Sequence, residues 1–99
     1  METLELQKQA NEIVDSIDKK LNVTHDETMI LNHLMEEFGE LARQHNDKNI
    51  RKIEQDQTNI EAEIADILIQ LMKFATIRDI NIEKAVINKI QKLKERHKL

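Results

Sequence analysis

The chain of 99 residues is long enough for one small domain, and its composition excludes several classes of protein. It has no cysteine, which rules out disulfide bonds and thiolate metal sites, and its N-terminal segment is too charged for a secretory signal. A net charge of −4 argues against the basic footprint of nucleic-acid-binding proteins, and no apolar run is long enough to cross a bilayer. We therefore expect a cytoplasmic protein that binds neither nucleic acid nor membrane.

Four helices are predicted over most of the chain, because apolar residues recur at helical spacing and proline is absent. They are expected over about residues 3–20, 26–45, 58–78 and 81–97, with a further short helix at about 50–53. The predicted fold is all-α, an antiparallel four-helix bundle over a single domain of residues 1–99, completed by oligomerisation. Apolar residues recur at helical spacing in the first helix, at Leu6, Ala10, Ile13, Ile17 and Leu21, and in the last helix Val86, Ile90 and Leu93 are expected to face inward.

The starts of three helices carry residues that suit an N-cap, where a short polar side chain accepts a hydrogen bond from the first turn. Thr24 or Asp26 is suited to cap the second helix, Thr58 or Asn59 the third, and Asn81 the fourth.

The third helix is the most apolar of the four. Ten of its fourteen residues from 64 to 77 are apolar, which predicts a central helix surrounded by others. Its main polar residues fall in one narrow stripe, Glu63, Asp66, Gln70 and Lys73. A stripe this narrow does not suit a solvent-facing side, and we expect it to face a polar group inside the protein.

Two pairs of carboxylates lie three residues apart, which places each pair on one helical face: Glu37 with Glu40, and Glu63 with Asp66. Such pairs are common on wet helix surfaces, but on the apolar third helix an unpaired carboxylate is unfavourable. Neighbouring helices in a bundle lie about 8–10 Å apart, within reach of these side chains. Four carboxylates without cysteine favour Mg²⁺, with Mn²⁺ as a substitute, so the sequence predicts a divalent cation site.

A ferritin-like di-iron centre is the nearest alternative, but it needs Glu-x-x-His on two helices and this chain contains no such motif. His33 lies one turn before Glu37, and we expect it to be a boundary residue of the helix rather than a ligand.

The stretch of residues 34–42 reads LMEEFGELA, and that of residues 63–69 reads EIADILI. Together they resemble the Glu-Glu-x-x-Glu and Glu-x-x-Asp motifs of MazG-like nucleotide pyrophosphohydrolases, which belong to the all-α NTP pyrophosphatase superfamily. The similarity continues through residues 80–86 to Lys89 and Arg96, so that it covers about residues 29–97.

This resemblance implies a helical bundle, assembled as a homodimer or homotetramer, that uses Mg²⁺ to cleave a (d)NTP into a (d)NMP and pyrophosphate. Water would attack the α-phosphorus, and pyrophosphate would leave. By position in the motifs, the metal ligands would be Glu37, Glu40, Glu63 and Asp66. Glu36 matches a less uniform position and would support catalysis by orienting water or binding a second ion.

The basic residues carry the expected contacts with the substrate phosphates. Lys89 and Arg96 match basic positions of the family, and Lys73 would either reach phosphate oxygens or form an ion pair with a site carboxylate. The chain departs from the family where relatives often carry Asn and Tyr, since it has Leu93 and His97 there.

Two alternatives remain open from the sequence. The same helices would also serve a non-catalytic interaction module, or a nucleotide or metal sensor that binds without turnover. The presence of all four predicted ligands argues against a pure scaffold, which has no need of carboxylates at those positions.

Overall fold

The computed structural model describes residues 2–49 and 57–99, and this part of the chain contains four α-helices and no strand. The helices are α1 (Thr3–Leu21), α2 (Glu27–Asn49), α3 (Gln57–Ile77) and α4 (Ile82–His97). The predicted all-α fold is confirmed. The short helix expected at about residues 50–53 lies outside the described residues.

Polar side chains cap two helices as predicted. Asp26 Oδ1 accepts a hydrogen bond from the Met29 amide at 2.9 Å, and Asn81 Oδ1 accepts one from the Lys84 amide at 3.1 Å. α3 is already helical at Gln57, so the prediction that Thr58 or Asn59 caps it is wrong, because both residues lie inside the helix. α1 ends at Leu21, and the left-handed backbone of its C-cap residue Asn22 (φ 54°) lets the Asn22 amide reach carbonyl groups in the last turn of the helix.

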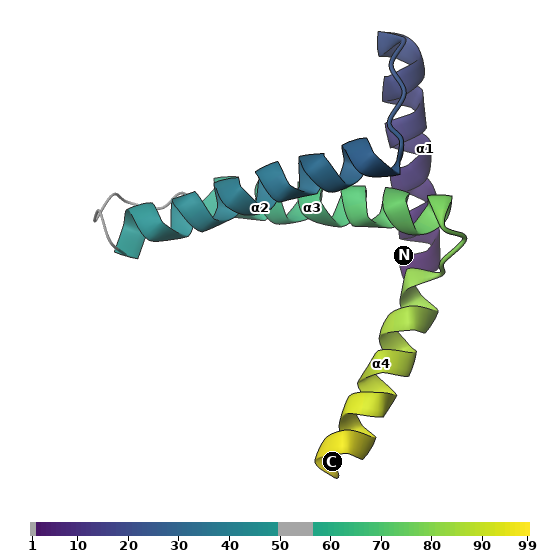
Figure 1. The fold of residues 1–99 in the computed structure, drawn as a ribbon, viewed down its shortest axis with the longest axis vertical. Helices are drawn as coiled ribbons and strands as arrows, with labels where there is room; N and C mark the ends of the chain where they lie inside the picture. Colours follow the sequence, from purple (N-terminus) through teal and green to yellow (C-terminus); the bar gives the residue numbers. More distant parts are fainter. Residues whose placement is uncertain (1, 50–56) are drawn as a thin grey trace.

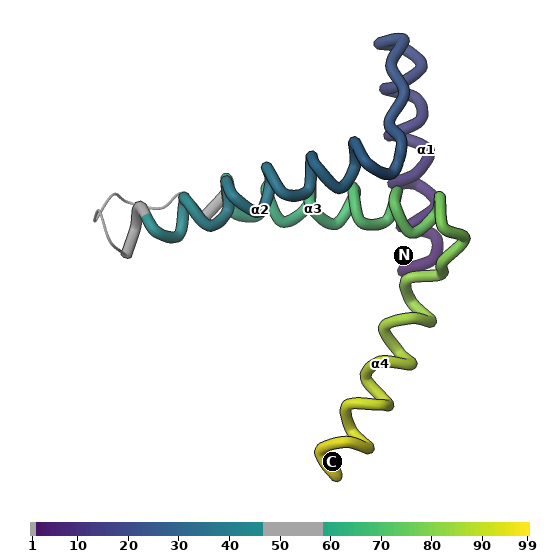
Figure 2. Tube along the Cα trace, viewed as in Figure 1, coloured from purple at the N-terminus to yellow at the C-terminus, as the bar shows by residue number. Residues whose placement is uncertain are grey.

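The antiparallel pair α2–α3 is the centre of the fold (Figures 1 and 2). α1 runs across the end of this pair where α2 begins and α3 ends, and it packs against α3. The core lies between α2 and α3, where Ile30, Leu34 and Ile67 are buried and Leu41 and Phe74 pack against them. α3 thus contacts both of its neighbours, as its apolar composition predicts.

α4 diverges from the α2–α3 pair and packs chiefly against α1 (Figure 1). No residue of α4 is buried, and Val86, Ile90 and Leu93 remain 51%, 47% and 38% exposed. The prediction that these three residues face a core is therefore wrong within a single chain, because among the described helices only α1 packs closely against α4. The most buried residues of α1 are Gln7, Ala10, Val14 and Asp18. Of its five apolar residues at helical spacing, Ala10 is buried, while Leu6, Ile13, Ile17 and Leu21 are exposed.

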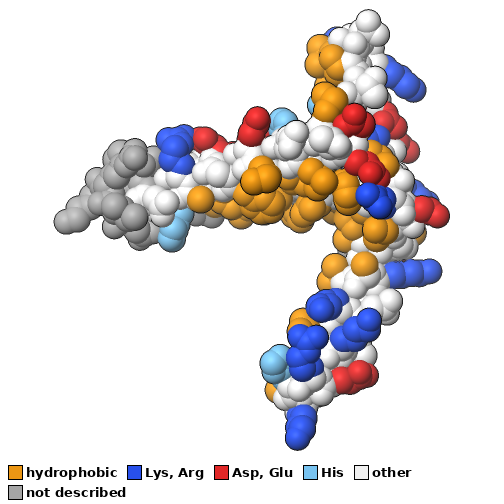
Figure 3. Space-filling view, viewed as in Figure 1, with side chains coloured by type: hydrophobic (Ala, Val, Ile, Leu, Met, Phe, Trp, Pro, Cys, Tyr) orange, Lys and Arg blue, Asp and Glu red, His pale blue; other side chains and the backbone are white. Residues whose placement is uncertain are grey.

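The molecule is open for its size. Its radius of gyration is 16.3 Å, against about 13 Å for a compact domain of about 100 residues. Apolar side chains gather over the α2–α3 pair, whereas basic side chains follow α4 (Figure 3). No helix in the described part of the chain is both long enough and apolar enough to span a membrane.

Gln7 joins the first helix to the connection between α3 and α4. Its side chain is 4% exposed, its amide nitrogen donates to the Ile80 carbonyl oxygen at 2.8 Å, and its amide oxygen accepts from the Ile82 amide at 3.0 Å. The amide nitrogen also lies 3.3 Å from the Thr76 hydroxyl oxygen. One buried side chain therefore satisfies the backbone on both sides of Asn81 and sets the start of α4.

Candidate active site

The packing of α2 on α3 brings the two carboxylate motifs together. Leu34 of α2 and Ile67 of α3 belong to the same buried cluster. Glu37 follows Leu34 by three residues, and Glu63 and Asp66 precede Ile67 by four and one. As a result Glu37, Glu63 and Asp66 each offer an oxygen within 4.8 Å of the others. Glu37 and Glu63 are half-buried, and Asp66 is exposed at the edge. Three of the four predicted ligands therefore converge.

Glu63 is in the least favourable setting for a negative charge. Its hydrogen bond with the Glu37 side chain, together with burial and repulsion from Glu37, Asp66 and Glu40, raises its pKa from 4.5 to about 7. Its Oε1 atom is buried and has no hydrogen-bond donor among the described residues. Glu63 thus has one unpaired buried oxygen and two further carboxylates within 4.8 Å, an arrangement that a cation would relieve, so the donor set fits a hard divalent metal ion.

Glu40 lies one turn beyond Glu37 but is not part of the group of three. Its carboxylate forms an ion pair with Arg43, and the Arg43 Nε atom donates to Glu40 Oε2 at 3.4 Å. The hydrogen bond to Arg43 lowers the pKa of Glu40, burial opposes this, and the charge of Arg43 lowers it further. Glu40 also contributes to the repulsion felt by Glu63, so it lies close to the group.

Glu36 and His33 are two further polar residues of α2 near the motif. Glu36 is exposed and does not belong to the group of three carboxylates. His33 contacts the site through its ring, because His33 Nε2 lies 3.1 Å from Glu37 Oε1. This contact holds one oxygen of Glu37 and restricts the orientation of the carboxylate. His33 is thus a partner of a predicted ligand rather than an isolated boundary residue.

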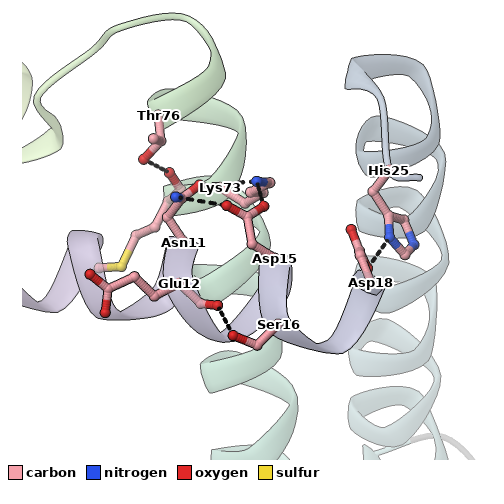
Figure 4. Close-up of polar contacts among 9 residues, drawn as sticks. Asn11, Glu12, Asp15, Ser16, Asp18, His25, Lys73 and Thr76 are labelled. Carbon is pink, nitrogen blue, oxygen red and sulfur yellow. Dashed lines mark hydrogen bonds and ion pairs between the residues drawn. The ribbon is translucent and has the colours of Figure 1, made fainter. Parts of the chain in front are cut away.

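Lys73 is buried at 8% exposure and lies between α3 and α1 (Figure 4). Its ammonium group pairs with Asp15 and donates to Asn11 Oδ1 at 3.0 Å. Of the two roles predicted for Lys73, the structure shows an ion pair, but with a carboxylate of α1 rather than one of the acidic motifs. A contact with substrate stays a prediction.

The predicted phosphate-binding residues Lys89 and Arg96 are exposed on α4, which diverges from the α2–α3 pair that carries the carboxylates (Figure 1). Within one chain the structure does not bring these two groups together with the acidic site.

Sequence reasoning missed the α1 partners of Lys73. Asn11 and Asp15 are one turn apart, and Asn11 follows Gln7 by four residues, so the three form a polar row along α1. Asn11 Nδ2 lies 3.4 Å from Asp15 Oδ2, which connects the row. Such a row was a detectable signal of a buried polar contact, although it did not identify Lys73 as the partner.

Comparison with protein families gives one finding that bears on this site. The family model for the MazG nucleotide pyrophosphohydrolase domain matches residues 25–99, which include all of α2, α3 and α4. Comparisons with curated proteins and with solved structures gave no match. The matched segment covers most of the chain and contains both carboxylate motifs, and the chain therefore belongs to the MazG nucleotide pyrophosphohydrolase domain family.

Proposed function

We propose that this protein is a Mg²⁺-dependent nucleoside triphosphate pyrophosphohydrolase, which cleaves a (d)NTP into a (d)NMP and pyrophosphate. The observation that carries the proposal is the approach of Glu37, Glu63 and Asp66 to within 4.8 Å of one another, from two helices of a MazG domain. A group of this kind supplies only oxygen ligands, which Mg²⁺ and Mn²⁺ prefer over softer donors.

The proposed ligands are the three converging carboxylates and Glu40. Glu40 would exchange its bond with Arg43 for the metal ion, which is favourable because a surface ion pair contributes little to stability. When bound, Mg²⁺ would neutralise charge on the triphosphate and lower the pKa of a coordinated water.

The remaining residues would bind and orient the reactants. Lys89 and Arg96 would offset phosphate charge, and Glu36 would orient the attacking water. Lys73 would be a further contact with substrate. Because α4 diverges from the carboxylates of its own chain, we infer that Lys89 and Arg96 reach the site of another copy in a homodimer or homotetramer. The exposed apolar residues of α4 support this assembly.

The decisive experiment is an assay of pyrophosphate and orthophosphate release from a panel of NTPs and dNTPs with Mg²⁺. We expect pyrophosphate as the primary product, and we expect Asp66→Asn and Glu40→Gln to abolish its release while circular dichroism shows unchanged helix content. Glu61→Gln is the matched control, since Glu61 is an exposed carboxylate on α3 outside the acidic group. It should retain activity.

Orthophosphate as the primary product would redirect the assigned reaction. Near-wild-type turnover of Asp66→Asn would show that the ligand assignment is wrong. Tight nucleotide binding by the wild-type protein without any turnover would favour the alternative of a nucleotide-sensing module.

A further inference from the structure

Gln70 is the residue of the α3 polar stripe that the proposed site leaves without a role. It follows Asp66 by four residues and Glu63 by seven, a spacing that places all three on one side of the helix. Glu63 and Asp66 belong to the acidic group, and Lys73 binds α1.

The amide oxygen of Gln70 is buried and has no hydrogen-bond partner among the described residues. Among the described residues, Gln70 Oε1 and Glu63 Oε1 are the two buried side-chain oxygens that receive no hydrogen bond. A buried amide oxygen without a donor lowers the stability of a folded protein, because its hydration is lost and not replaced. An apolar side chain of similar size would fold at least as well at this position.

The residues one turn before and after Gln70 on α3 are apolar and belong to the core. Ile67 is buried one turn before it, and Phe74 packs on the same core one turn after it. Gln70 is therefore a polar residue between two turns of α3 that pack in the hydrophobic core. A donor from a bound ligand would complete the hydrogen bond that the described residues do not supply.

The distance from the acidic group suits a nucleotide. At a rise of 1.5 Å per residue, Gln70 lies about 6 Å along the helix from Asp66 and about 10 Å from Glu63. An extended nucleoside triphosphate whose phosphates lie at the carboxylates is longer than this separation. Its nucleoside half would reach Gln70.

We propose that Gln70 is a specificity-determining residue, whose Oε1 accepts a hydrogen bond from an N–H of the base or an O–H of the sugar. This inference rests on the proposed function and extends it from the metal ion to the recognition of the nucleoside. A site that hydrogen-bonds one substrate group discriminates against analogues that lack it, because its own polar atom is then left unpaired.

The test compares Gln70→Leu and Gln70→Met with the wild-type protein, and Gln9→Leu is the matched control. Gln9 is an exposed glutamine of α1 that takes no part in the acidic group. For each variant, kcat/KM is measured over the four bases in ribose and deoxyribose form. Thermal unfolding and calorimetric titration with Mg²⁺ are done without nucleotide.

We expect both Gln70 variants to lower kcat/KM for the preferred nucleotide by about tenfold or more and to leave the poor substrates nearly unchanged. Loss of preference among bases would identify a base donor, and loss of preference for one sugar would identify a sugar hydroxyl. The melting temperature should stay the same or rise, the Mg²⁺ affinity should not change, and Gln9→Leu should behave as wild type.

Several results would overturn the inference. An equal loss for every nucleotide or a flat wild-type profile would exclude a role in specificity. A lower melting temperature in both Gln70 variants would assign a structural role, and weaker Mg²⁺ binding would make Gln70 a metal ligand. If wild-type protein releases no pyrophosphate from any nucleotide, the proposed function fails and this inference fails with it, whereas turnover with an unaltered variant profile removes only the inference.

Discussion

Glu63 shows how a single residue connects the metal site to pH. Its folded-state pKa of about 7 lies above its ordinary value of 4.5. At a pH between these two values, the folded protein without metal therefore holds a proton that the unfolded chain has already lost. The contribution of this group to stability is therefore present below the unfolded pKa and is lost as the pH rises towards the folded one. A metal ion has to displace that proton.

We expect the affinity for Mg²⁺ to rise with pH, by about tenfold between one pH unit below and one above the pKa of Glu63, because binding requires the deprotonated carboxylate. Calorimetric titration of the protein without nucleotide measures this. In EDTA, the melting temperature of the wild-type protein should fall relative to that of Glu63→Gln as the pH rises from 4.5 to about 7. A pH-independent affinity would show that Glu63 is not a ligand.

His33 provides a second residue-scale prediction. His33→Leu removes the contact of 3.1 Å with Glu37, and we expect Mg²⁺ binding to weaken by about tenfold, the lower end of the range for partners of metal ligands. His33→Gln can still donate to the carboxylate and should recover most of the affinity. Equal affinity in all three proteins would limit His33 to a surface role.

At the scale of elements, the contact between α1 and α3 depends on polar groups as much as on apolar ones. Lys73 is buried, whereas the Asp15 side chain is 46% exposed, so only one partner of the ion pair reaches solvent. Removal of Asp15 leaves a buried ammonium group without its carboxylate, whereas removal of Lys73 leaves a carboxylate that water can still reach.

We therefore expect Asp15→Ala to lower the free energy of unfolding by about 2 kcal/mol, and Lys73→Met, which keeps the volume of the side chain, to lower it by less. Urea unfolding measures both. The same Lys73→Met protein tests the predicted contact with substrate, because a loss of kcat/KM in a protein that stays fully folded at the assay temperature would support it. If Lys73→Met is the more destabilising change, an unpaired buried ammonium group is not what makes the loss of Asp15 unfavourable.

At the scale of the whole molecule, the exposed apolar surface is the main unexplained property of a single chain. Ile90 at 47% and Val86 at 51% exposure lie one turn apart on α4, and the radius of gyration of 16.3 Å exceeds that of a compact domain. Burial of such residues stabilises an assembly by roughly 25 cal/mol per Å² of apolar surface. The proposed oligomer would supply that burial.

We expect light scattering to give a mass that is a multiple of 11.7 kDa, and we expect Ile90→Glu to shift the protein towards the monomer, because the new charge would have to be buried. Asn88→Glu adds the same charge at an exposed polar position of α4 and should not change the mass. A wild-type monomer at micromolar concentration would contradict the assembly and the proposed origin of Lys89 and Arg96.

The sequence predicted those structural features that depend on residues within a single helix. The caps at Asp26 and Asn81 depend only on local backbone geometry, and the carboxylates of α3 stood out against an apolar background. The core positions of α4 were wrong because an apolar face indicates burial but not the molecule that provides it. The partner of Lys73 was missed because residues 58 apart are brought together by the crossing of two helices, which no local pattern determines.

The joint made by Gln7 has a consequence for how the sequence can vary. Its two closest contacts are with main-chain atoms: the Ile80 carbonyl oxygen, which every residue provides, and the Ile82 amide, which every residue but proline provides. Side chains at positions 80 and 82 are therefore free to change without loosening this joint, whereas position 7 needs both an acceptor and a donor at a fixed reach. The direction of the last helix is thus encoded far from that helix, near the opposite end of the chain.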